Sequence, residues 1–443
     1  MARPQEWLAL IHSGRGEAAL GQLYGRRPET VSRQQARYIT LIEQFQSLYS
    51  GGPSGVLRDP GETNLELFSA PGRTEVGGNH TDHNGGRVLA AAVDLDIAAA
   101  VSQTAGSQIT LNSEGYPPLA IDTRQLDPVP EERFTSAALA RGVCAGMAKA
   151  GGKLGGVNAC LASNIPRGSG LSSSAAYEML VATVLNELYN NGRFSPLSLA
   201  QFGQLAEERY FGKPSGLMDQ TTSAVGGFVT IDFKDFAAPL VRKVKYDLAG
   251  SGYALVIVET GGNHADLTPE YAACANEMKS VAQALGGKVL RDVSREQLLA
   301  KLPALRSKGL SDRAILRALH FFADDPRVVD QVQALEEGRF QRFLDLVNES
   351  GRSSWMLLQN CYPVSAPADP THQGIPLALA LSELRLKPRG AWRVHGGGFA
   401  GTIQAFLPAD MLSEYVAGME VVFGKGACHP VLVRQEGAGK LRS

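Results

Sequence analysis

The feature that most constrains the fold of this chain is a glycine- and serine-rich turn between two apolar segments. Residues 159–164 are typical of a strand, residues 175–190 are typical of an apolar helix, and NIPRGSGLSSSAA (164–176) lies at their junction. Glycines let a backbone approach a phosphate closely, successive N–H groups form an anion-binding nest, and the following helix directs its positive end to the same place. The serines add hydroxyl groups for phosphate oxygens or for Mg²⁺. This arrangement predicts a phosphate-binding turn.

The same turn also has a purely structural interpretation, because glycine and serine often do no more than cap a helix. The chain contains no GxxxxGK[ST] sequence, so the phosphate-loop lysine of the commonest ATPases is missing. If the turn binds phosphate, we expect a kinase in which serines and a carboxylate hold the metal.

Length and composition set the broader limits. At 443 residues, with 44% hydrophobic and 20% charged residues, the chain is long enough for two globular domains. Its 43 basic and 44 acidic residues leave a formal charge of −1, so nucleic acid is not expected as a partner. No apolar run approaches the length of about 18 residues that a membrane span needs, and the first residues carry no secretory signal. Five scattered cysteines without a CxxC pair argue against a disulfide framework or a structural zinc, so we expect a cytoplasmic protein.

The order of the expected elements favours an α+β architecture, because strands and helices mix without strict alternation. Residues 5–50 have helical apolar spacing, and a Gly/Pro-rich break follows at 51–55. We expect an N-terminal helical extension at residues 1–60, a domain that carries the turn at 61–245, and a second domain at 246–443. The other expected strands are 65–70, 88–101, 226–232 and 253–258, and the other expected helices are 134–150, 272–285, 311–337 and 340–358.

Together with the turn, three further passages resemble the motifs of one kinase superfamily. The turn is similar to the pattern PxxxGLxSSAA of the galacto-, homoserine, mevalonate and phosphomevalonate (GHMP) kinases. Residues 71–84, PGRTEVGGNHTDHN, resemble the galactokinase signature GRxNxIGEHTDYN, residues 216–220 resemble its GxMDQ segment, and residues 395–401 are similar to the third motif, GGGFGG. The resemblance implies the two-domain GHMP kinase fold, with a ribosomal protein S5 domain 2-like N-terminal domain and a ferredoxin-like C-terminal domain. It also implies ATP and Mg²⁺ as cofactors and a small sugar as the partner, bound between the domains.

The resemblance assigns chemical roles to particular residues. Phosphoryl transfer needs positioning, charge neutralisation and a group that accepts the proton of the nucleophile. Asp219 matches the catalytic aspartate of the family, and Arg73 matches the arginine that pairs with it. Ser174 and Glu207 match the two residues that hold Mg²⁺, although without the resemblance Glu207 would be read as a solvated glutamate. The resemblance places the nucleotide phosphates at Gly168, Ser169, Gly170, Leu171, Ser172, Ser173, Ser174 and Ala175.

Sugar recognition in the family uses the EHTD part of the signature, of which His80 and Asp82 are present. Asn79 stands in place of the glutamate, which in the family lies near the hydroxyl at carbon six of the sugar, and His83 replaces the tyrosine. An amide does not repel anions as a carboxylate does, so we expect Asn79 to tolerate a carboxylate at carbon six, as in galacturonic acid. With Tyr271, from a segment that resembles the EY of the family, and Gly397, the expected substrate residues are Asn79, His80, Asp82, Tyr271 and Gly397.

Three functions follow from these observations. The first is an ATP-dependent sugar-1-kinase of galactokinase type, which moves the γ-phosphate of ATP to the anomeric hydroxyl of a galactose-like sugar. The second is a kinase for galacturonate or for another sugar or polyol. The third is a non-catalytic regulator that binds sugar and ATP, which is disfavoured because residues 170–176 are complete where such regulators are disrupted. We expect a monomer or a small homo-oligomer.

Overall fold

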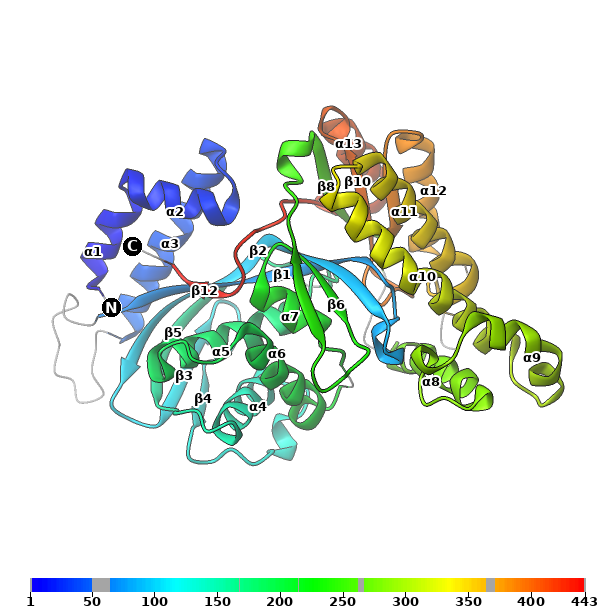
Figure 1. Cartoon of the computed structure of the whole chain (residues 1–443). Helices are drawn as coiled ribbons and strands as arrows, with labels where there is room; N and C mark the ends of the chain where they lie inside the picture. Colours follow the sequence, from blue (N-terminus) through cyan, green and yellow to red (C-terminus); the bar gives the residue numbers. More distant parts are fainter. Residues whose placement is uncertain are drawn as a thin grey trace.

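The computed structural model describes residues 2–49, 64–166, 168–213, 215–261, 267–363 and 371–441. Within these ranges, strands and helices are mixed and form two sheets with helices packed on them, which confirms the α+β prediction (Figure 1). None of the described helices is long and apolar enough to span a membrane. The Gly/Pro-rich break at residues 51–55 lies outside the described ranges.

The larger sheet has the strand order β12-β1-β2-β5-β3-β4, and β6 and β7 extend it from β2. Its pairs are antiparallel except for the parallel pair of β3 and β5. The strands are β1 (Glu66–Gly77), β2 (Arg87–Thr104), β3 (Gln108–Ser113), β4 (Leu119–Asp122), β5 (Gly156–Ser163), β6 (Phe228–Asp232), β7 (Leu240–Val244) and β12 (Gly439–Lys440).

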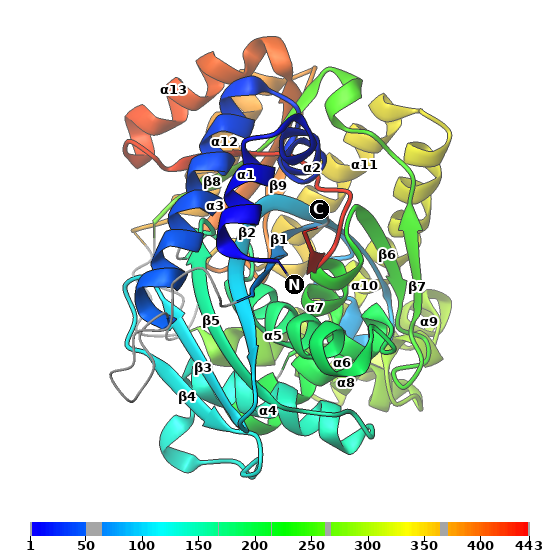
Figure 2. The same ribbon diagram turned by 90° about the vertical axis from the view of Figure 1, so that its left-hand side faces the viewer.

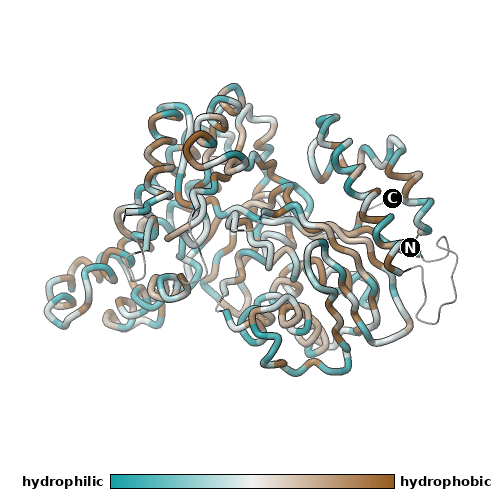
Figure 3. The backbone as a smooth tube through the Cα atoms, turned by 180° about the vertical axis from the view of Figure 1, so that it is seen from behind, coloured by the Kyte–Doolittle hydropathy of each residue, from teal (hydrophilic) through white to brown (hydrophobic). Residues whose placement is uncertain are grey.

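Helices cover both faces of this sheet, so β1 is buried along its whole length. Because successive strand side chains point to opposite faces, Phe68 packs in one hydrophobic core and its neighbour Leu67 packs in another. Figure 2 shows α3 lying along β5, and Figure 3 shows hydrophobic residues along the strands between the layers. One face carries α4 (Ser136–Lys149), α5 (Ser173–Asn190), α6 (Pro196–Leu205) and α7 (Met218–Val225), and the other carries α1 (Pro4–Ile11), α2 (Gly14–Tyr24) and α3 (Pro28–Tyr49).

The smaller sheet is antiparallel, with the order β11-β8-β10-β9. Strand β7 ends before residue 245 and β8 begins after it, in different sheets; the division into domains stays a prediction. This half contains β8 (Tyr253–Glu259), β9 (Ala391–Val394), β10 (Thr402–Pro408) and β11 (Cys428–Val431), with α8 (Thr268–Leu285), α9 (Arg295–Ser307), α10 (Asp312–Glu336), α11 (Phe340–Ser353), α12 (Gly374–Leu386) and α13 (Leu412–Phe423).

A buried charge cluster fastens the N-terminal helices and the C-terminal segment to the larger sheet. Asp96 of β2 accepts hydrogen bonds from Arg37 of α3 at 2.6 Å and from Arg434 at 3.1 Å. Burial alone would raise the pKa of Asp96, but the two guanidinium groups lower it below its usual value. The Asp96 N–H donates to the side chain of Asn164, the first residue of the Gly-Ser turn, at 2.6 Å. The cluster therefore ties the extension to the base of that turn.

Candidate active site

The Gly-Ser turn joins β5 to α5 and leaves the start of α5 without a side-chain cap. Ser172 adopts a left-handed backbone conformation (φ 57°) immediately before the helix, and its side chain makes no capping hydrogen bond. A Cβ added at Gly168, which also has a positive φ, would meet nothing within 4 Å. Amide groups at a helix start attract anions, and the open space at Gly168 leaves room for one. The turn therefore fits the phosphate-binding role predicted from the sequence.

The side chains of this turn differ in what they offer a ligand. Ser173 is exposed and Ser172 and Ser174 are half-buried, so their hydroxyl groups lie near the surface of the turn. Leu171 and Ala175 are buried and offer backbone groups instead. Ser169 is buried and donates a hydrogen bond of 2.8 Å to the carbonyl of Pro166, which stabilises the turn. Gly170 lies against the glycine-rich passage at 395–401, because a Cβ added there would lie 3.0 Å from Nδ1 of His395.

The structure brings Arg73 of β1 and Asp219 of α7 into a bidentate ion pair. Arg73 Nε donates to Asp219 Oδ1 at 2.6 Å, and Arg73 Nη2 donates to Asp219 Oδ2 at 2.5 Å. A third nitrogen, Nη1, donates to the carbonyl of Gly170 at 2.6 Å, so the pair is fixed to the Gly-Ser turn. Burial would raise the pKa of Asp219, but Arg73 lowers it below its usual value, with help from Ser172. The pair thus places the ionised carboxylate of Asp219 beside the expected phosphate site.

Ser174 and Glu207 also lie together, as oxygen ligands of one ion would. Ser174 Oγ donates to Glu207 Oε1 at 2.9 Å, and Glu207 is buried in a π-helical turn (Ala206–Phe211) that follows α6. Hydroxyl and carboxylate oxygens suit Mg²⁺, which is usually held by one or two protein groups together with substrate phosphates. In the described part of the chain, no three His, Cys, Asp or Glu side chains converge on one metal position. The Ser174 and Glu207 oxygens fit Mg²⁺ that is shared with a nucleotide.

A second buried acidic side chain, Glu178, lies close to this pair and was not predicted from the sequence. Gln220 Nε2 donates both to Glu207 Oε2 at 3.2 Å and to Glu178 Oε2 at 3.0 Å. Burial and the charge of Glu207 raise the pKa of Glu178 well above its usual value. A glutamate on the apolar helix 175–190 is the signal that could have drawn attention to it. Gln220, which directly follows Asp219 in the sequence, thereby connects α7 to the expected metal ligand Glu207.

The turn after β1 carries the predicted sugar-binding residues. Its backbone has positive φ at Gly78 (81°) and at His80 (58°), so the chain bends sharply there. Asp82 lies against the segment that leads into α7, because a Cβ added at Gly216 would approach Asp82 Oδ2 to 2.2 Å. Glycine at this position therefore allows the Asp82 carboxylate to lie close to the segment that carries Asp219.

The remaining predicted substrate residues come from the C-terminal half of the chain and meet the same turn. His80 Nε2 lies 2.9 Å from the carbonyl oxygen of Gly397, and burial lowers the pKa of His80 to about 4. The ring of Tyr271 stacks near that of His80, with centroids 6.5 Å apart, and packs directly on Gly397. The structure thus brings together residues that are far apart in the sequence, as the resemblance implied. Their contacts with a sugar stay a prediction.

Asn79 points into the protein rather than away from it. Its Nδ2 donates to the carboxylate of Glu75 at 3.0 and 3.1 Å and to the carbonyl of Gly396 at 2.8 Å. Its Oδ1 accepts from Asn360 at 2.8 Å and from Ser354 at 3.2 Å. A carboxamide has two N–H donors and two acceptor positions, so protein groups occupy all of them.

Helix α10 holds the backbone of this turn, which the sequence analysis did not foresee. Asp324 Oδ2 accepts hydrogen bonds from the N–H groups of Gly78 and Asn79, each at 3.1 Å. His320 Nε2 donates to the carbonyl oxygen of Asn79 at 2.8 Å, and both side chains are fully buried. Buried polar residues on an otherwise amphipathic helix are only a weak sequence signal of such a role. No local pattern connects these two side chains to a turn about 240 residues earlier in the sequence.

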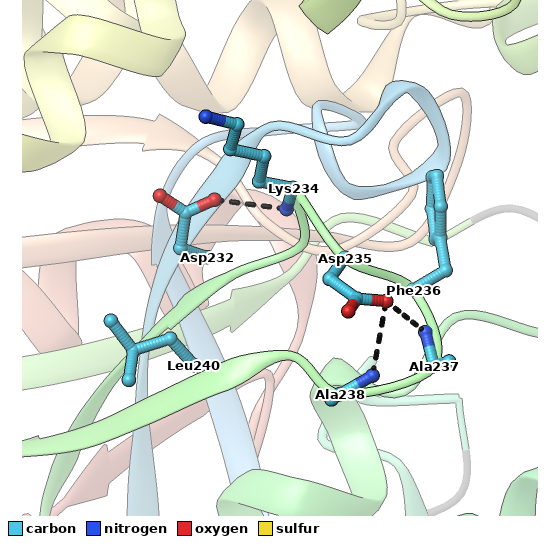
Figure 4. A pocket seen from close by; sticks show the side chains of 7 residues that line it. All are labelled: Asp232, Lys234, Asp235, Phe236, Ala237, Ala238 and Leu240. Carbon is cyan, nitrogen blue, oxygen red and sulfur yellow. Dashed lines mark hydrogen bonds between the residues drawn. The ribbon is translucent and has the colours of Figure 1, made fainter.

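A pocket elsewhere on the surface contains none of these residues. It lies at the connection between β6 and β7, where backbone N–H groups bond to the carboxylates of Asp232 and Asp235 (Figure 4). These contacts close a tight turn, so the pocket reflects loop geometry rather than a site for chemistry. Its lining residues are Asp232, Lys234, Asp235, Phe236, Ala237, Ala238 and Leu240.

Comparisons with known proteins agree with this fold. A model of the GHMP kinases N terminal domain matches residues 138–227, and a model of the galactokinase galactose-binding signature matches residues 61–103. The crystal structure of Lactococcus lactis galactokinase complexed with galactose has a TM-score of 0.74 at 24% identity, covering 91% of this chain and 99% of that one. The mevalonate kinase of Methanococcus jannaschii has a TM-score of 0.59 at 14% identity, covering 84% and 99%. The matched family model and the shared fold therefore indicate the class of the GHMP kinases.

A curated relative narrows this class to one family. The galactokinase of Streptomyces coelicolor is 33% identical over 389 residues, which cover 87% of this chain and 92% of that protein. The chain belongs to the galactokinase family, and it is an ATP-dependent sugar kinase of galactokinase type. The predicted superfamily, the GHMP kinase fold and the class of enzyme are thus confirmed.

Proposed function

We propose that this enzyme transfers the γ-phosphoryl group of ATP to the anomeric hydroxyl of a neutral, galactose-like sugar. The observation that carries the proposal is the Arg73–Asp219 pair, which is hydrogen-bonded to the Gly-Ser turn on one side. On the other side, Asp82 of the sugar signature lies against the segment before Asp219. A proton acceptor between a phosphate site and a sugar site is what a sugar kinase needs.

In the proposed mechanism, Asp219 accepts the proton of the attacking hydroxyl. Its lowered pKa keeps it ionised, and the bidentate contact with Arg73 fixes the direction of its oxygens. The remaining contact of Arg73, with Gly170, places positive charge beside the phosphate turn, where negative charge is transferred. The amide groups at the start of α5 would bind phosphate oxygens, with the hydroxyls of Ser172 and Ser173 near them.

Ser174 and Glu207 would hold Mg²⁺, which supplies charge neutralisation to the phosphates when it is bound. The buried amide of Gln220 fixes one Glu207 oxygen, which leaves the oxygen next to Ser174 to face the ion. This second layer limits the directions that the Glu207 carboxylate adopts.

The sugar would bind over the signature turn, with its ring hydroxyls on His80 and Asp82. The lowered pKa of His80 keeps its ring neutral, so it reads a hydroxyl as a hydrogen-bonding group and not as a charge. Tyr271 and Gly397 would form the adjoining wall, because the ring and the glycine already pack against each other. The regulator alternative has less support, since Asp219 and Arg73 are paired as an enzyme requires.

The place and assembly of the enzyme are also proposals. All five cysteines are buried thiols, which supports a reducing, cytoplasmic environment. Burial raises the pKa of those at 144, 274, 361 and 428 to about 12, which makes them unreactive. We propose a monomer or small homo-oligomer, whose active site is built within a single chain.

Product analysis tests the proposed reaction. The enzyme, ATP and Mg²⁺ are incubated with galactose, galacturonate and methyl galactoside, whose anomeric oxygen is blocked. We expect galactose to give a product whose phosphorus NMR signal couples to the anomeric proton, and we expect no product from methyl galactoside. A phosphate at carbon six, or turnover of the blocked sugar, would contradict transfer to the anomeric hydroxyl.

A further inference from the structure

The carboxylate and the amide of the galactokinase signature have changed places in this chain. In the signature GRxNxIGEHTDYN, the asparagine falls on Glu75 and the glutamate falls on Asn79. The two side chains lie in contact, since Asn79 Nδ2 donates to both carboxylate oxygens of Glu75 at 3.0 and 3.1 Å. The chain therefore keeps one carboxylate and one amide in this part of the site, with their order along the chain reversed.

The contacts of the two residues divide their roles. Every hydrogen-bonding position of the Asn79 amide is taken by Glu75, Gly396, Ser354 or Asn360, so Asn79 has nothing left for a ligand. The carboxylate of Glu75 offers about four acceptor positions, and Asn79 Nδ2 is one donor shared between its two oxygens. Glu75 thus retains the capacity to accept a hydrogen bond from a hydroxyl group.

The position of Glu75 on β1 brings this free acceptor capacity close to the predicted sugar-binding residues. Arg73 and Glu75 lie on the same face of β1, because strand side chains alternate and the pairing with β2 is regular between them. Burial raises the pKa of Glu75 to about 7, Arg393 and Arg73 oppose the rise, and Asp82 adds to it. Arg73 belongs to the pair with Asp219, Asp82 belongs to the sugar turn and Arg393 belongs to β9, so the Glu75 carboxyl group is near enough to both parts of the site to sense their charges. It is also buried enough, with 4% of its surface exposed, for its charge to act strongly on a bound anion.

We propose that Glu75, held in place by Asn79, is the specificity-determining residue of the sugar site. Its carboxylate accepts a hydrogen bond from a hydroxyl group of a neutral sugar, and its negative charge repels sugars that carry a carboxylate. The inference rests on the proposed function and names the substrate class of the same site. It differs from the expectation that Asn79 opens the pocket to galacturonate, because the negative charge is present four residues earlier.

The first experiment compares native enzyme with Glu75→Gln at pH 8, where the Glu75 carboxyl is ionised. Activity on galactose and on galacturonate is measured as kcat/KM, and binding of both sugars is measured by calorimetry. We expect the preference for galactose over galacturonate to fall by about 10-fold or more in Glu75→Gln, the scale of one charged contact, while the KM for ATP changes little. Glu66→Gln is the matched control, since Glu66 is a buried glutamate at the far end of the same strand, paired with Lys440 at 2.7 Å. An unchanged sugar preference in Glu75→Gln would overturn the proposal.

The second experiment exchanges the pair. Asn79→Glu alone places two carboxylates about 3 Å apart, so we expect weaker binding of both sugars. The double variant Glu75→Asn/Asn79→Glu restores one carboxylate and one amide, and we expect it to recover the native preference within about threefold. If Asn79→Glu alone instead raises the preference for galactose by about 10-fold, Asn79 reads the sugar directly and the proposal is wrong.

Failure of the proposed function is separable from failure of this inference. A native enzyme that turns over neither sugar contradicts the proposed function. The role of Glu75 is then tested by the calorimetric affinities of native enzyme and Glu75→Gln for the two sugars. If Glu75→Gln weakens the binding of galactose more than the binding of galacturonate, the result supports Glu75 as the specificity-determining residue. Equal effects on both sugars, or no binding of either, overturn it.

Discussion

Single residues carry the proposed chemistry of this enzyme, and the environment of each residue decides whether it is ionised. Asp219 is ionised because Arg73 outweighs the cost of burial, whereas Glu178 is kept neutral because burial and the charge of Glu207 act together. Gln220, the neighbour of Asp219 in the sequence, donates hydrogen bonds to Glu178 and to Glu207. The sequence identifies Asp219 through its motif, but the burial of Glu178 depends on the packing of helices around it.

The role of Glu207 is testable by its dependence on metal. Glu207→Gln removes the charge and keeps the size of a group that would hold Mg²⁺. We expect the Mg²⁺ concentration for half-maximal rate to rise by about 10-fold or more, with little change in the KM for the sugar. Glu208→Gln is the control, because Glu208 is the exposed neighbour on the other side of the helical turn. Equal Mg²⁺ dependence in both variants would contradict the assignment.

At the scale of elements, the proposed sugar site depends on how α10 holds the turn after β1. A single buried carboxylate, Asp324, accepts two backbone N–H groups of a turn that begins the sugar signature. The lowered pKa of Asp324 keeps its charge, because His320 and Arg327 outweigh the effect of burial. The helix thus holds the backbone that leads directly into His80 and Asp82.

This arrangement predicts a selective defect in Asp324→Asn. The amide loses the charge that binds two N–H groups, so we expect the KM for the sugar to rise by about 5- to 100-fold, the range that one charge-assisted hydrogen bond covers. The KM for ATP should change by less than about threefold, because the Gly-Ser turn has its own supports. Asp330→Asn, at an exposed position of the same helix, should leave both constants unchanged. A parallel rise in both KM values would reveal a general loss of structure instead.

The sequence predicted local features of the elements well and their long-range contacts poorly. The Gly-Ser turn was predictable because a strand, a turn and a helix follow one another within a few residues. The N-terminal extension was predicted to be helical and consists of α1, α2 and α3. Helices α6, α7, α9, α12 and α13 and strands β3, β4, β7 and β9 to β12 were not predicted. The contacts of α10 with the sugar turn could not be predicted, since contacts over hundreds of residues leave no local periodicity.

At the scale of the whole molecule, segments from both ends of the chain pack against the larger sheet. The C-terminal strand β12 returns to pair with β1, the strand that carries Arg73 and Glu75 (Figure 1). Arg434, just before it, joins the buried cluster with Asp96 and the N-terminal helices. The Gly-Ser turn, the sugar turn and the glycine-rich passage at 395–401 are thus held by both halves of the chain. Motifs in sequence order indicated this convergence through resemblance, whereas the supporting contacts came from the structure.

The most direct test of the account is the rate of phosphoryl transfer in Asp219→Asn. The substitution keeps the shape of the side chain and removes its ability to accept a proton. We predict that kcat on the preferred sugar falls by at least about 100-fold while the affinity for ATP changes little, because the phosphate turn is left intact. Asp235→Asn, in the β6–β7 connection outside the site, should retain native turnover. Near-native turnover in Asp219→Asn would contradict the claim that Asp219 activates the sugar hydroxyl.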